Sequence, residues 1–289
     1  MKFGSVSNPD EIDFKLPADH PDTKASLAKL KAKKFNAYVG CAKWNKADLK
    51  NFYPRGTKDE LQYYATQFNS IELNASFYRL FPAEQYAKWK ENTPDGFKFF
   101  PKFGQEISHW ARLKDTNELV DKFIFHISHL GDRLGVPFLQ MHDNFSPKDF
   151  DRVKNFIEHL PKNYPVAIEF RHTDWYNKNE IAEELYALLE KHKLINVLVD
   201  TAGRRDLMHM RLTAQTAFVR YVGANTDSDY TRLDAWVDRI AKWKKEGLHT
   251  LYFFIHQNVE EASPLLAAHF IEKLNKKIGT TLTIPYKAL

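Results

Sequence analysis

The fold prediction starts from residues 167–172, with the sequence AIEFRH, because they place two charged side chains in an otherwise apolar predicted strand. Side chains of a strand alternate between its two faces, so Glu169 and Arg171 share one face and Ile168 and Phe170 share the other. The apolar face suits packing against helices. We therefore expect the charged pair on the opposite face, near the carboxyl end of the strand.

The residues on either side of this strand alternate between strand-like and helix-like segments. Helices are indicated by apolar residues at spacings of three and four, and the first of them is expected to begin with a capping box formed by Thr57 and Glu60. The predicted strands cover residues 36–41, 70–75, 97–102, 136–141, 165–170, 194–200, 216–222 and 250–255. The predicted helices cover residues 57–68, 82–92, 115–130, 146–160, 179–192, a weakly patterned 204–212, 233–240 and 264–276.

This alternation predicts an α/β protein in which right-handed crossovers join parallel strands. Eight strand–helix units in about 250 residues match a single-domain (β/α)8 barrel of the TIM type better than an open doubly wound sheet. No glycine-rich turn follows the first strand, which disfavours a dinucleotide-binding fold. We therefore expect a barrel over residues 36–289, preceded over residues 1–35 by an N-terminal extension with a short helix.

Composition limits the classes of partner. The chain has 289 residues, of which 43% are hydrophobic, and this is ample for one large core. Its formal net charge of +5 favours anionic ligands and permits a nucleic-acid partner without requiring one. Cys41 is the single cysteine, which excludes an internal disulfide, and no apolar run is long enough for a membrane span. We expect a cytoplasmic protein with no membrane partner.

Polar side chains lie at the same end of seven of the eight predicted strands. They are Glu72, Asn74, Lys102, Gln140, His142, Glu169, Arg171, Asp200, Arg220 and His256. Active sites of (β/α)8 barrels lie at the carboxyl ends of the strands, where the following loops converge. The alternative is a set of buried ion pairs that tie the strands together. Burial of so many charges has a large desolvation cost and returns little stability, so we favour a functional cleft.

These residue types suit acid–base chemistry on a small anionic ligand that carries a phosphate or a carboxylate. The expected anion clamp is Lys102, Arg171 and Arg220, because a guanidinium offers two parallel hydrogen bonds to such a group. The predicted catalytic acids and bases are Glu72, His109, Glu169 and Asp200. The predicted ligand-binding residues, in which aromatic rings would wall the ligand, are Trp44, Asn74, Tyr78, Lys102, Gln140, Arg171, Trp175, Arg220 and His256. We expect no organic cofactor.

Two other kinds of site are alternatives. A divalent metal for a hydrolase or isomerase could be held by carboxylates and imidazoles from different strands, and the candidate ligands are Glu72, Glu169, Asp200, His142 and His256. No short-spaced ligand motif supports this hypothesis, and the nearby cations oppose it. The second alternative is a nucleic-acid-binding or phosphodiester-processing protein, for which Arg204, Arg205 and the loop aromatics would supply the surface.

The motifs at these positions resemble those of the YecE-like family, domain of unknown function 72. In chain order they are Gly40, Trp44, FYP (52–54), ELNASFYR (72–79), Trp89, TP (93–94), Lys102, SH (108–109), LGDRLG (130–135), Gln140, EFRH (169–172) with Trp175, Asp200, and Arg220 with Gly223. The resemblance covers residues 36 to about 270 and implies a (β/α)8 barrel. It implies no reaction, because the family has no generally assigned activity. The chain departs from the family at residues 141–144, where members usually have prolines, and at residues 256–258, where many have paired asparagines.

Overall fold

The computed structural model describes residues 4–28 and 34–285. Its strands are β1 (Asn36–Cys41), β2 (Ser70–Leu73), β3 (Lys98–Pro101), β4 (Phe138–Gln140), β5 (Ala167–Glu169), β6 (Ile195–Asn196), β7 (Leu198–Asp200), β8 (Thr216–Gly223) and β9 (Thr250–Gln257). They form three sheets, ordered β1-β9-β8-β7, β2-β3 and β4-β5-β6, and every pair within them is parallel. The prediction of an α/β fold with parallel strands is confirmed.

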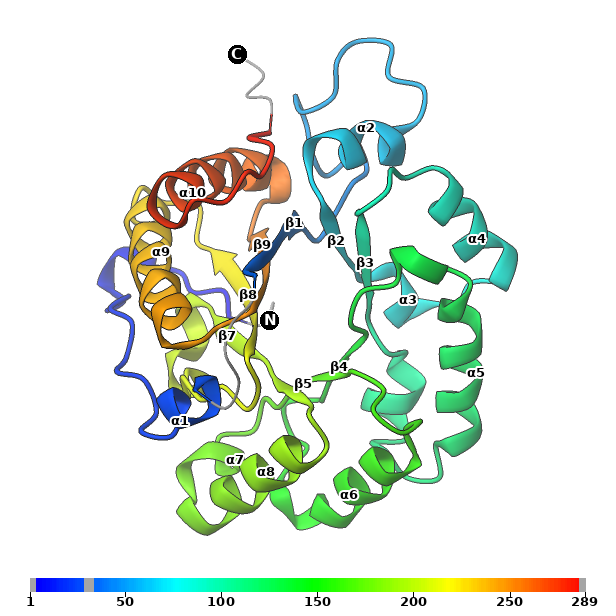
Figure 1. Cartoon of the computed structure of the whole chain (residues 1–289), viewed down its shortest axis with the longest axis vertical. Coiled ribbons are helices and arrows are strands. Elements are labelled where there is room, and N and C mark those ends of the chain that lie inside the picture. The colour runs from blue at the N-terminus through cyan, green and yellow to red at the C-terminus, as the bar shows by residue number, and fades with distance from the viewer. Residues whose placement is uncertain (1–3, 29–33, 286–289) are drawn as a thin grey trace.

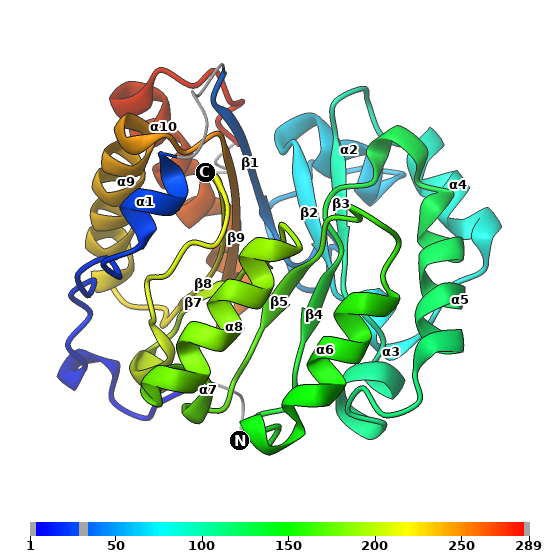
Figure 2. The ribbon, with the colours of Figure 1, turned by 60° about the horizontal axis from the view of Figure 1, so that its bottom comes forward.

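Helices cover the outside of the strands, which surround a common centre (Figure 1; Figure 2). In the described part of the chain they are α1 (Thr23–Leu27), α2 (Glu60–Gln67), α3 (Ala75–Tyr78), α4 (Ala83–Glu91), α5 (Asn117–Ser128), α6 (Phe150–His159), α7 (Asp174–Asn177), α8 (Asn179–Lys191), α9 (Ser228–Glu246) and α10 (Ser263–Ile278). Short helices α3 and α7 directly follow strands and are additions to the predicted set. No described helix combines the length and the apolar character that a membrane crossing requires.

Three local predictions need correction. The single strand predicted over residues 194–200 is two strands, because β6 pairs with β5 whereas β7 pairs with β8. The first long helix is capped by Asp59, whose carboxylate accepts from the N–H of Gln62 at 2.9 Å; the Thr57 hydroxyl instead donates to a turn carbonyl. The weak helix predicted over residues 204–212 is only a short 3₁₀ segment, Ala202–Leu207.

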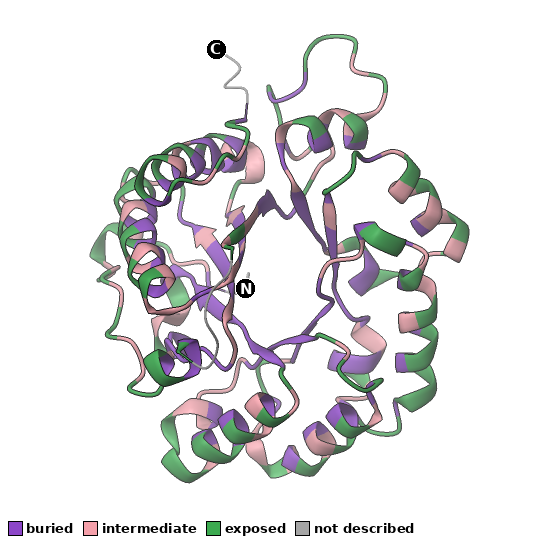
Figure 3. Ribbon diagram, viewed as in Figure 1, coloured by how far each residue is buried: buried purple, intermediate pink, exposed green. Residues whose placement is uncertain are grey.

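An inner core of side chains fills the space between the strands. Phe218 on β8 lies with its ring centre 5.5 Å from Phe138 on β4, 5.9 Å from Phe100 on β3 and 5.2 Å from Phe254 on β9. The buried residues of this cluster are Phe100, Val136, Phe138, Ala167, Ile195, Val197, Val199, Phe218 and Phe254. A separate outer core lies between strands and helices, so the strands are largely buried (Figure 3). The alternation of the two faces along each strand follows from strand geometry.

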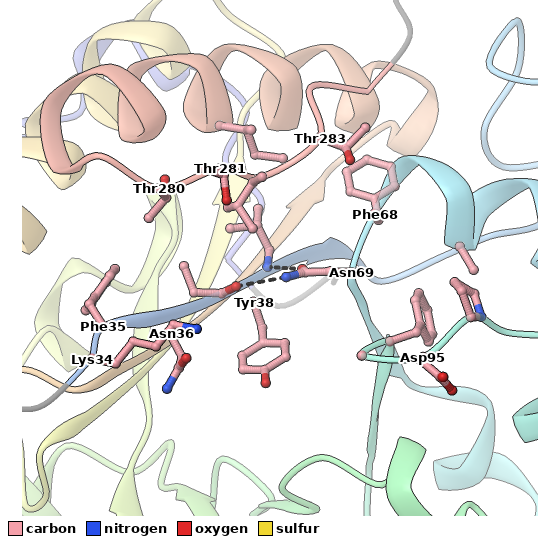
Figure 4. A pocket seen from close by; sticks show the side chains of 18 of the residues that line it. Lys34, Phe35, Asn36, Tyr38, Phe68, Asn69, Asp95, Thr280, Thr281 and Thr283 are labelled. Atoms are coloured by element: carbon pink, nitrogen blue, oxygen red, sulfur yellow. Dashed lines mark hydrogen bonds between the residues drawn. The ribbon is translucent and has the colours of Figure 1, made fainter.

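Side chains join the edges of β1 and β2, which share no backbone ladder. Asn69, just before β2, donates from Nδ2 to the carbonyl of Ala37 at 2.8 Å and accepts from the N–H of Val39 at 2.9 Å. Figure 4 shows both bonds beside a hollow of about 770 Å³ at the amino ends of the strands. One amide side chain therefore pairs two β1 edge groups that would otherwise lack a protein partner.

Tyr64 forms a second bridge between the same two strands. Its hydroxyl accepts from the N–H of Cys41 at 2.7 Å and donates to the carbonyl of Ser70 at 3.0 Å. The backbones approach closely beside it: a Cβ on Gly40 would lie 2.1 Å from the carbonyl oxygen of Ser70. Glycine is therefore required at this position, and β1 and β2 are neighbours despite belonging to different sheets.

The N-terminal extension packs against much later parts of the chain. The hydroxyl of Thr23, at the start of α1, donates to the carbonyl of Met210 at 2.9 Å. The carboxylate of Asp19 accepts from Arg239 of α9 at 2.6 Å. Residues 4–28 thus lie along the side of the molecule that β7, β8 and α9 form.

Candidate active site

Arg220, on β8, lies at the centre of the charged set predicted from the sequence. Its Nε and Nη2 each donate to a carboxylate oxygen of Glu72 at 2.8 Å, so this pair is bidentate. Its Nη1 donates to Glu169 Oε2 at 2.6 Å. His256 Nε2 lies 3.1 Å from Glu72 Oε1, and Asn74 Nδ2 donates to the same oxygen at 2.8 Å. One guanidinium therefore joins strands β2, β5 and β8.

Glu169 continues the network toward β4 and β3. Arg171 Nε donates to Glu169 Oε1 at 2.6 Å, and Gln140 Nε2 lies 3.0 Å from both carboxylate oxygens. The other end of the Gln140 amide, Oε1, accepts from Lys102 Nζ at 2.7 Å. The structure thus brings eight predicted residues into one hydrogen-bonded network: Glu72, Asn74, Lys102, Gln140, Glu169, Arg171, Arg220 and His256.

Strand alternation explains why these side chains meet. On β3, β4 and β8 a phenylalanine of the inner core precedes the network residue by two positions, as in Phe218 and Arg220. The network therefore forms the next layer toward the carboxyl ends of the strands. The guanidinium carbon of Arg220 lies 5.3 Å from the centre of the Phe138 ring, where the apolar layer ends and the charged layer begins.

The two buried carboxylates are ionised at neutral pH. Burial alone would raise the pKa of Glu72, but Arg220 and His256 hold that pKa well below its usual range. Burial also opposes ionisation of Glu169, whereas Arg171 and Arg220 lower its pKa to about 2. Both carboxylates are committed to guanidinium groups, so their direct effect is to hold Arg220 and Arg171 in place.

The surroundings of Lys102 disfavour its charged form, whereas those of the two carboxylates favour theirs. Burial first, and then the positive charges of Arg220 and Arg171, lower the pKa of its amine to about 7, although Glu169 and Glu72 act in the other direction. Its Nζ also lies 4.0 Å from the centre of the Phe77 ring. A substantial fraction of Lys102 is therefore a neutral amine at physiological pH.

The network opens into a cleft of about 560 Å³ at the carboxyl ends of the strands. Arg171, Arg220 and His256 line it, together with two lysines and three carboxylates from the segments that follow β1 and β9: Lys43, Asp48, Lys50, Glu260 and Glu261. The hollow at the amino ends is larger, but among the residues that the structure describes no charged network lines it. Charge and convergent side chains favour the cleft at the carboxyl ends as the candidate site.

His109 lies beside the network on a single π-helical turn, Glu106–Trp110, that follows β3. Its Nδ1 is 2.9 Å from the hydroxyl of Ser108, and its ring centre lies 4.8 Å from Phe77 and 5.2 Å from His142. Burial, together with the charge of Lys102, lowers the pKa of His109 to about 4. It is therefore a neutral imidazole at physiological pH, able to accept a proton.

Two exposed aromatic rings and three residues with left-handed backbone lie next to His109. We call this region, which consists of Tyr78 and residues 110–115, the rim. Tyr78 at the end of α3 and Trp110 at the end of the π-helical turn are each 71% exposed. Just beyond this turn, Arg112, Leu113 and Asp115 have φ values of 51°, 62° and 52°. Such conformations are unfavourable for residues with a side chain and tend to occur at functional loops.

Asp200 does not belong to the network, which corrects its predicted catalytic placement. Its carboxylate accepts from Arg232 Nη2 at 2.7 Å and from Trp236 Nε1 at 2.6 Å, both on α9, and it also pairs with Arg205. On β7 the inner-core residue is Val199. Asp200, one position later, therefore faces outward and anchors α9 to the sheet.

Trp175 is a packing residue, which corrects its predicted contact with a ligand. It is fully buried, its Nε1 donates to the carbonyl of Phe145 at 2.7 Å, and its ring centre lies 4.4 Å from that of Phe170. Trp44 is partly buried, with its ring edge-on to Trp89 at 5.7 Å. A ligand contact by Trp44 stays a prediction.

The metal hypothesis finds no assembled ligand set. Across residues 4–28 and 34–285 no three His, Cys, Asp or Glu side chains are grouped so that they could hold a metal ion. The guanidinium of Arg220 lies between Glu72 and Glu169, and Asp200 faces α9. These carboxylates therefore bind arginine side chains, whereas the hypothesis required them to bind a metal ion.

Five charged residues at the cleft were missed by sequence reasoning. They are Lys43, Asp48 and Lys50, which follow β1, and Glu260 and Glu261, which follow β9; Glu260 Oε1 lies 3.8 Å from His256 Nδ1. All five lie outside the strands, where strand periodicity gives no information about direction. Their position just after the carboxyl end of a strand is the one signal that could have indicated them.

Comparison with known proteins identifies the family. Residues 38–287 match the family model described as "Protein of unknown function DUF72". The UPF0759 protein YecE of Escherichia coli (strain K12) is 28% identical over 276 residues, which cover 87% of this chain and 98% of that protein. The UPF0759 protein YunF of Bacillus subtilis (strain 168) is 28% identical over 149 residues, covering 48% of this chain and 52% of YunF.

Solved structures of two DUF72 family proteins have a similar fold. The protein from Enterococcus faecalis V583 superposes with a TM-score of 0.69 at 16% identity, covering 86% of this chain and 99% of that one. The protein from Thermotoga maritima MSB8 gives a TM-score of 0.67 at 24% identity, with 83% and 99% of the two chains covered. At these identities the likeness concerns the fold.

Proposed function

The chain belongs to the DUF72 family of proteins of unknown function, and on this premise we propose that it is an enzyme acting on a small anionic ligand by acid–base chemistry. The ligand would carry a phosphate or carboxylate and would bind at the carboxyl ends of the strands. One observation carries the proposal: Arg171, Arg220 and His256 line a single cleft and also share one buried network with two carboxylates and Lys102.

Arg171 and Arg220 are the proposed anion clamp. Each is held by Glu169, through Arg171 Nε and Arg220 Nη1, so neither guanidinium has to be ordered when a ligand arrives. Lys43 and Lys50 also line this cleft, but each is paired with a carboxylate that lines it too, Asp48 at 3.3 Å and Glu261 at 3.7 Å. A small anion entering there would therefore depend on the two arginines at the inner wall.

His256 and His109 are the proposed acid and base. His256 lines the cleft in contact with Glu72, and His109 is a neutral imidazole beside Lys102 and Phe77. A neutral imidazole can accept a proton in one reaction step and return it in a later one. Glu72 and Glu169 were predicted from the sequence to be catalytic. Because their carboxylates already accept hydrogen bonds from Arg171 and Arg220, they would instead position these arginines.

We further propose that the three sheets form one closed (β/α)8 barrel of a cytoplasmic protein. Isolated parallel bridges connect Phe99 to Leu134 and Lys102 to Phe138, linking the β3 region to the β4 region. Asn69 and Tyr64 link β1 to β2 through their side chains. The cytoplasmic assignment rests on Cys41, a buried free thiol.

Thermal unfolding in phosphate and in chloride at equal ionic strength tests the anion site. A ligand at about 100 times its dissociation constant adds roughly 2.7 kcal/mol, which for a chain of this length means a rise of several degrees in the unfolding midpoint. We expect this rise in the wild type and its loss in Arg171→Ala. Arg55→Ala, at an exposed arginine outside the cleft, is the matched control and keeps the rise. The clamp is rejected if phosphate raises the unfolding midpoint of Arg171→Ala as much as that of the wild type. It is also rejected if phosphate, phosphate esters and small carboxylates all fail to raise the midpoint of the wild type.

Binding of single-stranded nucleic acid is a second candidate, favoured by Tyr78 and Trp110. Both rings are 71% exposed, one at the end of α3 and the other at the end of the π-helical turn, and bases stack on such rings with about 1–3 kcal/mol each. Replacement of both by alanine would weaken fluorescence-detected binding of an oligonucleotide by at least about tenfold. Absence of oligonucleotide binding to the wild type at low salt would exclude this candidate.

A further inference from the structure

Lys102 is a buried lysine that has no carboxylate partner in the part of the chain that the structure describes. Only 7% of the residue is exposed, and it directly follows β3 with its side chain in the charged layer. Its Nζ donates one hydrogen bond, to the amide oxygen of Gln140. Within residues 4–28 and 34–285 no carboxylate oxygen lies within 4.0 Å of Nζ. A buried lysine normally requires a paired negative charge, so its amine is poorly stabilised as an ammonium ion.

The carboxylates that act on Lys102 within the described residues are already bound by arginines. Glu72 and Glu169 are bound by Arg220, and Glu169 also by Arg171. Burial and the two guanidinium charges together lower the pKa of Lys102 to about 7. Desolvation combined with neighbouring cations is a known way to prepare a lysine as a nucleophile, because only the neutral amine has a lone pair to donate.

We propose that Lys102 forms an imine with the carbonyl carbon of a small aldehyde or ketone that carries a carboxylate or phosphate. The Nζ lone pair attacks the carbonyl carbon as the π electrons of the carbonyl move to its oxygen, and transfer of one proton from nitrogen to that oxygen gives a carbinolamine. The oxygen then gains a second proton and leaves as water while the nitrogen lone pair forms the carbon–nitrogen double bond, and the nitrogen releases its remaining proton. No oxidant or reductant takes part. The inference rests on the proposed function, because Arg171 and Arg220 would hold the anionic end of that carbonyl compound.

Phe77 and His109 support this role by their positions. Nζ of Lys102 lies 4.0 Å from the centre of the Phe77 ring, and the His109 ring contacts the same phenylalanine edge-on at 4.8 Å. His109 is therefore close enough for its own pKa to be lowered by the charge of Lys102. As a neutral imidazole it can accept the proton that nitrogen loses and return it to the leaving oxygen.

Reductive trapping on the wild-type protein tests the proposal. The protein is incubated with glyoxylate and cyanoborohydride between pH 6 and pH 9, and digestion with mass mapping gives the rate of carboxymethylation of each lysine. An ordinary lysine is neutral at pH 7 in only about one molecule in 2,500, against about half for a pKa near 7. We expect Lys102 to react at least about tenfold faster than exposed Lys122, with half-maximal rate near pH 7. Lys102→Met keeps the side-chain length and removes this label.

The outcomes separate the imine from the anion clamp. Faster labelling of Lys102 that is slowed by added phosphate supports both. Faster labelling of Lys102 that neither phosphate nor Arg171→Ala slows supports the nucleophile and rejects the clamp. Labelling of Lys102 no faster than that of Lys122 overturns the imine proposal, and a phosphate-dependent rise in the unfolding midpoint would then still support the anion site. The comparison of Lys102 with Lys122 is read on the wild type, so the test of the imine itself does not depend on the folding of any variant.

Discussion

Arg220 and Glu72 are 148 positions apart in the sequence and meet at the centre of the molecule, where two guanidinium nitrogens each lie 2.8 Å from a carboxylate oxygen. Glu169 approaches the same guanidinium from a third strand. Arg220 thus neutralises two buried carboxylates, and the charged layer depends on it more than on any other residue of the network.

Replacement of Arg220 by methionine should destabilise the protein by about 3–5 kcal/mol, because Glu72 and Glu169 then lose their shared counter-ion while remaining buried. Equilibrium urea unfolding measures this difference. Lys277→Met, which removes an exposed ion pair with Asp238 at 3.0 Å, is the control and should change stability by less than about 0.5 kcal/mol. A cost below about 1 kcal/mol for Arg220→Met would contradict the central role of this arginine.

The low pKa of Lys102 predicts a gain in stability as pH rises above 7. The folded protein releases its Lys102 proton near pH 7, whereas the unfolded chain keeps this proton up to a pKa of about 10.5. Between these values the unfolded state binds more protons, so the free energy of unfolding increases with pH. Relative to Lys102→Met, the wild type should gain about 2 kcal/mol between pH 7 and pH 9, measured by urea unfolding at each pH. Parallel pH profiles for the two proteins would rule out a shifted Lys102.

Asp200→Asn should reduce stability without affecting anion binding. The substitution removes the charge that Arg232 and Arg205 share, at a cost of about 3 kcal/mol. The phosphate-dependent rise in the unfolding midpoint should keep its full size, since Asp200 faces α9 and not the cleft. If a folded Asp200→Asn protein did not show that rise, Asp200 would have to contribute to anion binding.

Strand periodicity predicted the network where one face of a strand is clearly apolar. Glu169 and Arg171 alternate with Ile168 and Phe170, so the direction of the charged pair could be read from four residues. In residues 194–200 the inward face is the apolar one, Ile195, Val197 and Val199, whereas Asn196 and Asp200 lie on the other face. The rule that the polar face of a strand points inward, which holds at Glu169, therefore placed Asp200 on the wrong face.

Loop residues could not be placed in the same way. Trp175 and Tyr78 both follow strands of the site and have similar side chains, yet one is fully buried and the other is 71% exposed. Their directions are set by packing between elements distant in sequence, such as Trp175 against the loop at Phe145. The sequence therefore predicted the strands and most of the charged layer. The directions of the side chains that follow the strands could be seen only in the structure.

Asn69→Ala should weaken the junction between β1 and β2. Without the amide, the N–H of Val39 and the carbonyl of Ala37 lose their partner, at a cost of about 1–3 kcal/mol. Urea unfolding and the exchange rate of the Val39 amide hydrogen both report on this loss, and the exchange should become faster. Asn155→Ala, on the exposed face of α6, should leave both unchanged. An unaltered Val39 exchange rate would show that the strands hold together without Asn69.

The position of the N-terminal extension has a consequence for biosynthesis. Asp19 is translated 220 positions before its partner Arg239, and the carbonyl of Gly4 accepts from the N–H of Gly203. At a ribosomal rate of about 5–20 residues per second, the extension waits roughly 10–45 s for the surface on which it docks. Residues 4–28 should therefore be anchored among the last during synthesis, and a nascent chain arrested before α9 would leave them undocked.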